Sequence, residues 1–102
     1  MEVILFTRKV DNFIADLTNQ DRIETIQTIL LLGSFGHTVS PQYSKKIGKD
    51  LFELRIKGEH FVRIFYTFYK GEAYLLHGYF KKTNKIPRHE LEYVLQVLKR
   101  LA

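Results

Sequence analysis

The feature that most constrains the fold is a hydrophobic period of two between residues 51 and 82. The run Leu51–Lys57 alternates between apolar and polar residues, as a strand with one buried face does. Two further runs, Phe61–Tyr69 and Ala73–Lys82, are rich in aromatic and β-branched residues. Short turns at Gly58-Glu59 and Lys70-Gly71-Glu72 separate the three runs. This region is therefore predicted to form an antiparallel three-stranded meander.

The residues before this meander indicate a short strand and two helices. Val3–Phe6 is wholly apolar and is typical of a buried strand. One helical face then recurs at three- and four-residue spacing, in Val10, Phe13, Ile14 and Leu17. A second helix is expected to begin at Asp21, which forms a capping box with Glu24. Its apolar stripe consists of Ile23, Ile26 and Leu30.

Glycines and a last proline complete the predicted order of elements. Gly33 is expected to end the second helix in a left-handed cap, and residues 33–50 are expected to form a loop. Pro87 suits the first position of a closing helix. The apolar stripe of that helix consists of Leu91, Val94, Leu95, Leu98 and Leu101.

The predicted fold class is α+β, with the order β-αα-βββ-α in one domain over residues 1–102. A small, antiparallel-rich sheet is expected to carry the N-terminal helical hairpin on one face, together with a C-terminal helix.

Composition narrows the possible functions. The chain has no cysteine, which excludes disulfides, thiol nucleophiles and thiolate metal sites and fits a reducing cytoplasm. No signal peptide is visible, and no apolar run is long enough to span a membrane, so we expect a cytoplasmic protein. The formal net charge of +5 favours polyanionic partners such as nucleic acid.

Two arginines in the predicted strands are the first candidate functional residues. Arg55 and Arg63 lie in the middle of otherwise apolar runs, where an unpaired charge must face solvent or a partner. If their strands pair through the Gly58-Glu59 turn, both guanidinium groups lie on one face and match phosphate oxygens. The alternative is a salt bridge on the sheet surface between Arg55 and Glu53 or another carboxylate.

A second group of cations lies next to the predicted last strand. Four of them occur within eight residues just before a helix N-terminus, namely Lys81, Lys82, Lys85 and Arg88. Free N–H groups at a helix start also favour an anion. Lys45 and Lys46 are expected at the same edge of the sheet. The alternative is a solvated basic turn. Alternation along the strand places Lys81 and Lys82 on opposite sides, and the pattern leaves open which of them faces the groove.

Histidines and aromatic residues are further candidates. The four histidines are His37, His60, His77 and His89. No two have the spacing of a helical zinc site, and neither a metal site nor a cofactor motif is predicted. His77 lies in a strand and is the candidate for proton transfer, with a satisfied core histidine as the alternative. Exposed members of the set Tyr66, Tyr69, Tyr79 and Phe80 are candidates for stacking on unpaired bases.

These strand sequences resemble a known family. The segments are Leu51-Phe52-Glu53-Leu54-Arg55, then Val62-Arg63-Ile64-Phe65-Tyr66, then Leu75-Leu76-His77-Gly78-Tyr79-Phe80-Lys81-Lys82-Thr83, with Pro87 and a closing helix. Together they are similar to the HigB-like, phage-derived branch of the RelE/ParE toxin superfamily of type II toxin–antitoxin systems. The resemblance covers nearly the whole chain in order and is specific between residues 51 and 90.

The resemblance implies a RelE-like fold and a metal-independent endoribonuclease that cleaves mRNA, usually on the ribosome, and so inhibits translation. The attacking group would be the RNA's own 2′-OH. By motif position, Arg63 would stabilise charge on the phosphate, and Lys81 or Lys82 would assist the leaving 5′-oxygen or the phosphate. Arg55, Lys45 and Lys46 would hold the backbone. The expected partner is an antitoxin of the helix-turn-helix type.

One departure from the family concerns the general base. Some members use a tyrosine or a histidine–aspartate set near the C-terminus, where this chain offers only Arg88 and His89. The general base is therefore unassigned, with His77 as the candidate. Two other functions stay open. One is a ParE-like, non-catalytic poison of DNA gyrase. The other is an inactive module that binds only an antitoxin or nucleic acid.

Overall fold

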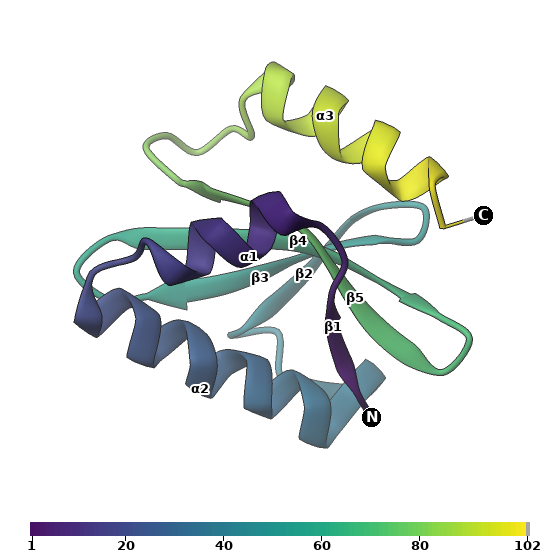
Figure 1. The fold of residues 1–102 in the computed structure, drawn as a ribbon, viewed down its shortest axis with the longest axis horizontal. Helices are drawn as coiled ribbons and strands as arrows, with labels where there is room; N and C mark the ends of the chain where they lie inside the picture. Colours follow the sequence, from purple (N-terminus) through teal and green to yellow (C-terminus); the bar gives the residue numbers. More distant parts are fainter. Residues whose placement is uncertain (102) are drawn as a thin grey trace.

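The computed structural model describes residues 1–101 and shows an α+β fold, with a five-stranded mixed sheet and three α-helices (Figure 1). The elements, with one short 3₁₀ turn η1, are β1 (Val3–Leu5), α1 (Arg8–Ala15), α2 (Asn19–Phe35), η1 (Gly36–Thr38), β2 (Ser44–Gly48), β3 (Leu51–Lys57), β4 (Phe61–Tyr69), β5 (Glu72–Phe80) and α3 (Arg88–Lys99). Among these residues, no helix is both long and apolar enough to cross a membrane.

The sheet has the strand order β1-β5-β4-β3-β2. The predicted meander is present as β3, β4 and β5, which pair antiparallel. The first strand lies beside β5 and runs parallel to it, with Val3 opposite Ala73. Because this pairing joins segments far apart in the chain, nothing in the local sequence pattern indicated it.

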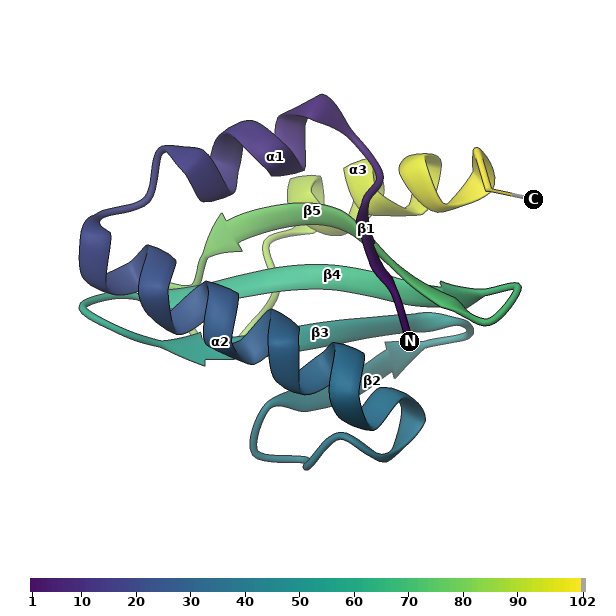
Figure 2. The same ribbon diagram turned by 60° about the horizontal axis from the view of Figure 1, so that its bottom comes forward.

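Two apolar cores lie on the two faces of the sheet. One packs α1 and α2 against β3, β4 and β5 around Leu54, Ile64 and Leu75, none of which is exposed. The other packs α3 against Phe65 and Leu76 through Val94 and Val97. Figure 2 shows α2 crossing in front of the sheet and α3 behind it. The N-terminal helices and the C-terminal helix therefore cover opposite faces.

The ends of α2 differ from the prediction. Thr18 is the N-cap, and its side chain accepts a hydrogen bond from the backbone N–H of Asp21. Asp21 itself is buried and is bonded elsewhere, so it does not cap the helix. The helix also continues past Gly33 and ends before Gly36, which has the positive φ of 55°. The end of the helix was therefore predicted at the wrong glycine, and Gly36, with a ψ of −126°, does not adopt the left-handed helical conformation of the predicted cap.

The exposed face of α2 is also unexpected. The stripe of Ile23, Ile26 and Leu30 is about half exposed or more, at 56, 46 and 64%. The buried positions of this helix are instead Asp21, Thr25, Thr28 and Leu32. Hydrophobic spacing thus predicted the helix correctly but not its buried side, because the polar residues Thr25 and Thr28 are buried where the predicted apolar stripe is exposed.

The predicted loop over residues 33–50 contains a strand. Ser44–Gly48 forms β2 at the edge of the sheet, antiparallel to β3, with an irregular register between Lys46 and Gly48. Both lysines of this strand, Lys45 and Lys46, are exposed, and only Ile47 packs against a core. A short edge strand buries too little to show alternation, and exposed lysines are common on such edges. The observed order is therefore β-αα-ββββ-α.

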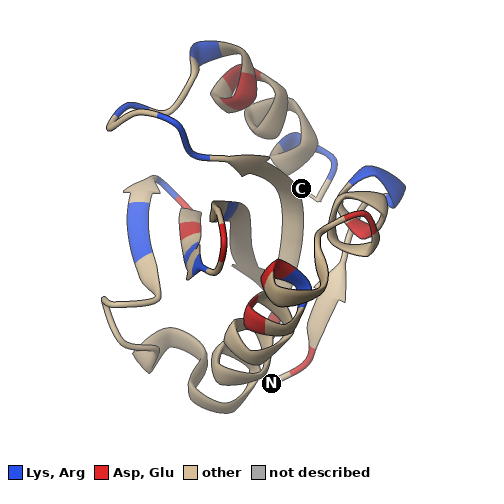
Figure 3. Ribbon diagram, turned by 90° about the vertical axis from the view of Figure 1, so that its left-hand side faces the viewer, with Lys and Arg blue, Asp and Glu red and all other residues tan. Residues whose placement is uncertain are grey.

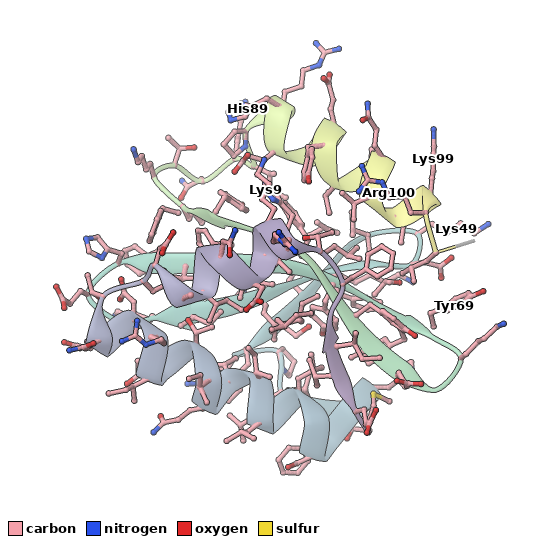
Figure 4. All side chains as sticks on the ribbon, viewed as in Figure 1. Lys9, Lys49, Tyr69, His89, Lys99 and Arg100 are labelled. Atoms are coloured by element: carbon pink, nitrogen blue, oxygen red, sulfur yellow. The ribbon has the colours of Figure 1, made fainter. Side chains whose placement is uncertain are left out.

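The C-terminal helix covers only part of its face. It packs chiefly on β5, and Lys9 of α1 reaches it from the side, with the ammonium group 4.2 Å from the centre of the Tyr93 ring. Figure 4 shows Lys9 rising from α1 towards α3, with Lys99 and Arg100 at the far end of that helix. The end of the sheet near the β3–β4 turn is left open to solvent, as the clefts described next show.

Candidate nucleic-acid interface

Arg55 and Arg63 lie side by side on the open part of the sheet. They are direct partners in the antiparallel pairing of β3 with β4, so their side chains leave the sheet on the same face. That face is the one opposite α1 and α2, because the neighbouring Leu54 and Ile64 belong to the core beneath those helices. Two guanidinium groups therefore emerge from adjacent strands towards the same space.

Arg63 is held from below by a buried carboxylate. Its side chain is 11% exposed, and its Nε lies 3.7 Å from Oε1 of Glu53, whose side chain is 2% exposed. This distance makes an ion pair but not a hydrogen bond. Glu53 also accepts a hydrogen bond of 2.9 Å from the hydroxyl of Tyr79. Among residues 1–101, only Nη1 of Arg63 has a hydrogen-bond partner, the carbonyl of Val62.

Burial shifts the pKa values of Arg63 and Tyr79 without changing their charge states at neutral pH. Burial lowers the pKa of Arg63; the Glu53 carboxylate opposes this effect, and Arg55 adds to it. A guanidinium group nevertheless keeps its charge in proteins. Burial raises the pKa of Tyr79, and Glu53 raises it further, so this tyrosine stays a neutral hydrogen-bond donor. The arrangement presents one fixed cation, Arg63, with unused donors.

Arg55 lines an open cleft of about 630 Å³, termed here the arginine cleft, which also contains Glu24, Tyr43, Lys57, Phe61 and Arg63. Within residues 1–101, Arg55 forms no ion pair, and its buried Nε has no hydrogen-bond partner. The alternative of a sheet-surface salt bridge between Arg55 and Glu53 is therefore wrong. The carboxylate lies against Arg63 instead.

A second cleft adjoins the first. The lysine cleft, of about 290 Å³, is lined by Phe61, Arg63, Lys81, Lys82, Thr83 and Asn84. Its lining contains three cations and no carboxylate. Both Lys81 and Lys82 take part, because β5 ends at Phe80 and strict alternation does not apply beyond it. In Figure 3 the cations of the segment after β5 and those of the outer strands lie around one side of the curved sheet.

Phe61 stands where the clefts meet. It lines the arginine cleft, the lysine cleft and a third cleft of about 420 Å³ that contains His60 and shares Lys81 and Lys82. The side chain of Phe61 is 50% exposed. It is the first residue of β4, and its exposure was not predicted, because the alternating pattern of the strand gives no sign of where α3 stops covering the face.

The predicted candidates for base stacking differ in how far they are exposed to solvent. Tyr66 and Tyr79 are almost fully buried, and Tyr69 lies beside a cleft at the opposite hairpin, between β4 and β5. Phe80 is 42% exposed and lines the third cleft. Of the predicted candidates, only Phe80 is accessible next to the cations, and Phe61 and the half-buried Tyr43, which were not predicted, also line the cationic clefts.

Several predicted site residues lie outside the three clefts. They are exposed but line none of them, namely Lys45, Lys46, Lys85 and Arg88. The Nε of Arg88 lies 2.8 Å from Oε1 of Glu92, one turn along α3, as a surface ion pair. The structure thus brings together Arg55, Arg63, Lys81 and Lys82, and leaves the other cations at the periphery.

His77 lies beneath α3 and lines none of the three clefts. The residue is 4% exposed, its Nε2 is 3.1 Å from Oε1 of Glu90, and its ring packs on Tyr93 with centroids 4.6 Å apart. Its Nδ1 is buried with no hydrogen-bond partner among residues 1–101. Burial lowers the pKa of His77, and the Glu90 carboxylate offsets this only in part.

We expect His77 to make the fold sensitive to mild acid. Because its pKa in the folded chain lies below the ordinary 6.5, the unfolded chain binds the proton more readily. The free energy of unfolding should therefore fall as the pH drops from about 7.5 to about 5.5, and His77→Gln should reduce that fall. Urea denaturation of both proteins at the two pH values measures this change in the free energy of unfolding. Asp21 titrates in a lower range, since its pKa is below 3.8. Equal pH dependence in the two proteins would contradict this role.

No cluster of three or more histidine, aspartate or glutamate side chains suited to a metal ion occurs within residues 1–101.

A family model described as Phage derived protein Gp49-like (DUF891) matches residues 12–99 of the chain. No curated protein matches the sequence. The matched region includes Arg55 and Arg63, both lysines of the lysine cleft and the whole of α3.

Proposed function

The chain belongs to the Gp49-like family of phage-derived proteins, a RelE-like, toxin-like family, and from this premise we propose that it is an mRNA-cleaving toxin. The finer assignment is to the HigB-like branch of type II toxin–antitoxin systems. In this proposal the protein is an endoribonuclease that inhibits translation. An antitoxin of the helix-turn-helix type would block the cationic face.

The observation that carries the proposal is the meeting of four cations in adjoining clefts. Arg55 and Arg63 come from β3 and β4, and Lys81 and Lys82 from the segment after β5. The lysine cleft has no carboxylate in its lining, so an anion there meets only positive charge and neutral groups. Phosphates of an RNA strand have the charge that this lining lacks.

The cleavage chemistry needs little more than these groups. The 2′-oxygen of the RNA attacks the adjacent phosphorus, the bond to the 5′-oxygen breaks, and a 2′,3′-cyclic phosphate and a 5′-OH result. Arg63 would stabilise the charge that develops on the phosphate oxygens, because its side chain lines the lysine cleft. A lysine ammonium would protonate the leaving oxygen. Arg55 would hold a neighbouring phosphate in the arginine cleft.

Placement of the RNA depends on more than the reacting phosphate. Phe61, at the meeting point of the clefts, would stack on one base and so fix the strand across both of them. The peripheral cations Lys45, Lys46, Lys85 and Arg88 would contact more distant phosphates, including those of ribosomal RNA. Alignment by the ribosome would supply the in-line geometry that few protein groups can impose alone.

The test uses purified protein and ribosomes programmed with a short mRNA. We expect cleavage that yields a cyclic phosphate and a 5′-OH, because the nucleophile belongs to the RNA. A matched mRNA with a single 2′-deoxy nucleotide at the cleavage site should stay intact. Expression without an antitoxin should give new 5′ ends inside reading frames by primer extension. DNA damage with intact transcripts would instead indicate a gyrase poison, and products with a 5′-phosphate and a 3′-OH would contradict attack by the RNA's own 2′-OH.

A further inference from the structure

A buried aspartate holds a histidine at the edge of the lysine cleft. Asp21 is in the first turn of α2, and its side chain is 1% exposed. Its Oδ1 accepts the backbone N–H of His60 at 3.1 Å, and its Oδ2 lies 2.7 Å from Nδ1 of the same residue. Both oxygens of one carboxylate therefore fix one residue of the β3–β4 turn, 39 positions away in the chain.

The turn is shaped to allow this approach. A Cβ atom at Gly58 would lie 2.4 Å from Oδ1 and 3.2 Å from Cα of Asp21, so any larger residue would push the turn away from α2. The ring of Phe80 meets the imidazole edge-on, with centroids 5.7 Å apart. His60 is thus held from its backbone, from one ring nitrogen and from one side of the ring.

The contact with Asp21 also selects the tautomer. Burial alone would raise the pKa of Asp21, but the hydrogen bonds from His60 outweigh it and the net effect lowers the pKa. The carboxylate is therefore ionised at neutral pH and requires a proton on Nδ1 of His60. The neutral imidazole then has its lone pair on Nε2, and 55% of the side chain is exposed, so a substrate can reach it.

His60 lies next to the cations. It lines the third cleft, which shares Phe61, Lys81 and Lys82 with the lysine cleft. The titratable groups that line this cleft are Asp16 after α1, Asp21 on α2, Glu59 and His60 in the β3–β4 turn, and Lys81 and Lys82 after β5. Arg63 lines the lysine cleft and His60 the third cleft, so the two residues belong to neighbouring clefts joined by Phe61 and both lysines.

We propose that His60 is the general base of RNA cleavage and that Asp21 is its positioning residue. Nε2 takes the proton of the attacking 2′-OH as the bond from the 2′-oxygen to phosphorus forms. The bond to the 5′-oxygen breaks, and that oxygen takes a proton from the ammonium group of Lys81 or Lys82. Solvent returns both residues to their starting states. This assignment rests on the proposed function and fills the role left open by the family resemblance.

The test combines three measurements, because a general-base role for His60 and a purely structural role for the Asp21–His60 pair predict different results in them. His60→Ala should lower the cleavage rate by about 100-fold, within the range of general-base catalysis. Free imidazole in the buffer should restore part of this rate. The wild-type rate should fall as the pH is lowered, because a protonated imidazole accepts no proton, and this fall should disappear in His60→Ala.

Two further variants separate the base from the fold. His60→Gln keeps the backbone N–H and offers an amide to Asp21, and it should be folded and as slow as His60→Ala. The control is His37→Gln, an exposed histidine at the opposite end of α2, which should cleave at the wild-type rate. A folded His60→Gln with the wild-type rate, or a His60→Ala that imidazole does not rescue, would overturn this assignment while wild-type cleavage still supported the proposed function. Absence of cleavage by the wild-type protein would overturn both.

Discussion

Replacing Arg63 with alanine should slow RNA cleavage by about 100-fold to 1,000-fold, the usual cost of removing one well-placed donor from a developing anion. On β3 and β4, Arg63 is the only cationic residue that lines both the arginine cleft and the lysine cleft. Burial and the carboxylate of Glu53 restrict its side chain, so its donors are already aligned when RNA binds. Single-turnover cleavage on programmed ribosomes measures the loss.

The controls for Arg63→Ala separate chemistry from folding. Arg63→Lys keeps a cation above Glu53 but loses the planar fork, so it should be folded and should be slowed by a smaller factor. Arg8→Ala removes an exposed arginine at the start of α1 that lines none of the three clefts, and it should cleave at the wild-type rate. Wild-type rates in folded Arg63→Ala and Arg63→Lys would show that the site has been assigned to the wrong residue.

Removing the carboxylate beneath Arg63 should destabilise the fold strongly. Glu53→Ala leaves a nearly buried guanidinium without its counter-charge and the buried hydroxyl of Tyr79 without its acceptor. Breaking a buried ion pair from one side typically costs about 3–5 kcal/mol, and we expect Glu53→Ala to lower the free energy of unfolding by about that amount. Urea denaturation monitored by circular dichroism is the measurement.

A double variant and a surface control sharpen this expectation. In Glu53→Ala with Arg63→Met neither charge of this pair stays buried, so a good part of the lost stability should return. Glu92→Ala breaks the exposed pair with Arg88 on α3 and should change the free energy of unfolding by less than about 1 kcal/mol. If Glu53→Ala were as mild as Glu92→Ala, the carboxylate would not be the counter-ion that stabilises Arg63 in the fold.

The sequence predicted the parts of the fold that rest on local patterns. The three long strands follow from alternation and turn residues, and α3 follows from its apolar spacing and from Pro87. The edge strand β2 was missed because its exposed lysines hide the alternation, and the parallel β1–β5 pairing joins residues that no local pattern connects. The outward stripe of α2 misled the prediction, since Thr25 and Thr28 are buried whereas Ile23 and Ile26 are exposed.

The candidate site likewise has features that the local sequence predicts and features that depend on how the helices dock on the sheet. That Arg55 and Arg63 share a face follows from pairing two strands through a short turn, which the sequence shows. The pair of Asp21 with His60 depends on where α2 docks, so it could not be predicted from either residue alone. The burial of His77 depends likewise on α3, which covers only the part of the sheet near β5. An Asp in a helical first turn and a Gly-Glu-His turn are too common to have indicated a site.

The parallel pairing of β1 with β5 sets the order in which a growing chain can acquire its structure. Val3–Leu5 has no partner strand until Ala73–Leu75 has been made, and the second core waits for Val94 and Val97. Pairings over such long separations slow folding, because the loop must close before its contacts form. Nascent chains that stop before β5 carry both arginines but neither lysine of the cleft. Interrupted translation therefore releases fragments that lack a complete cationic cleft and, with unpaired strands, are ready substrates for proteases.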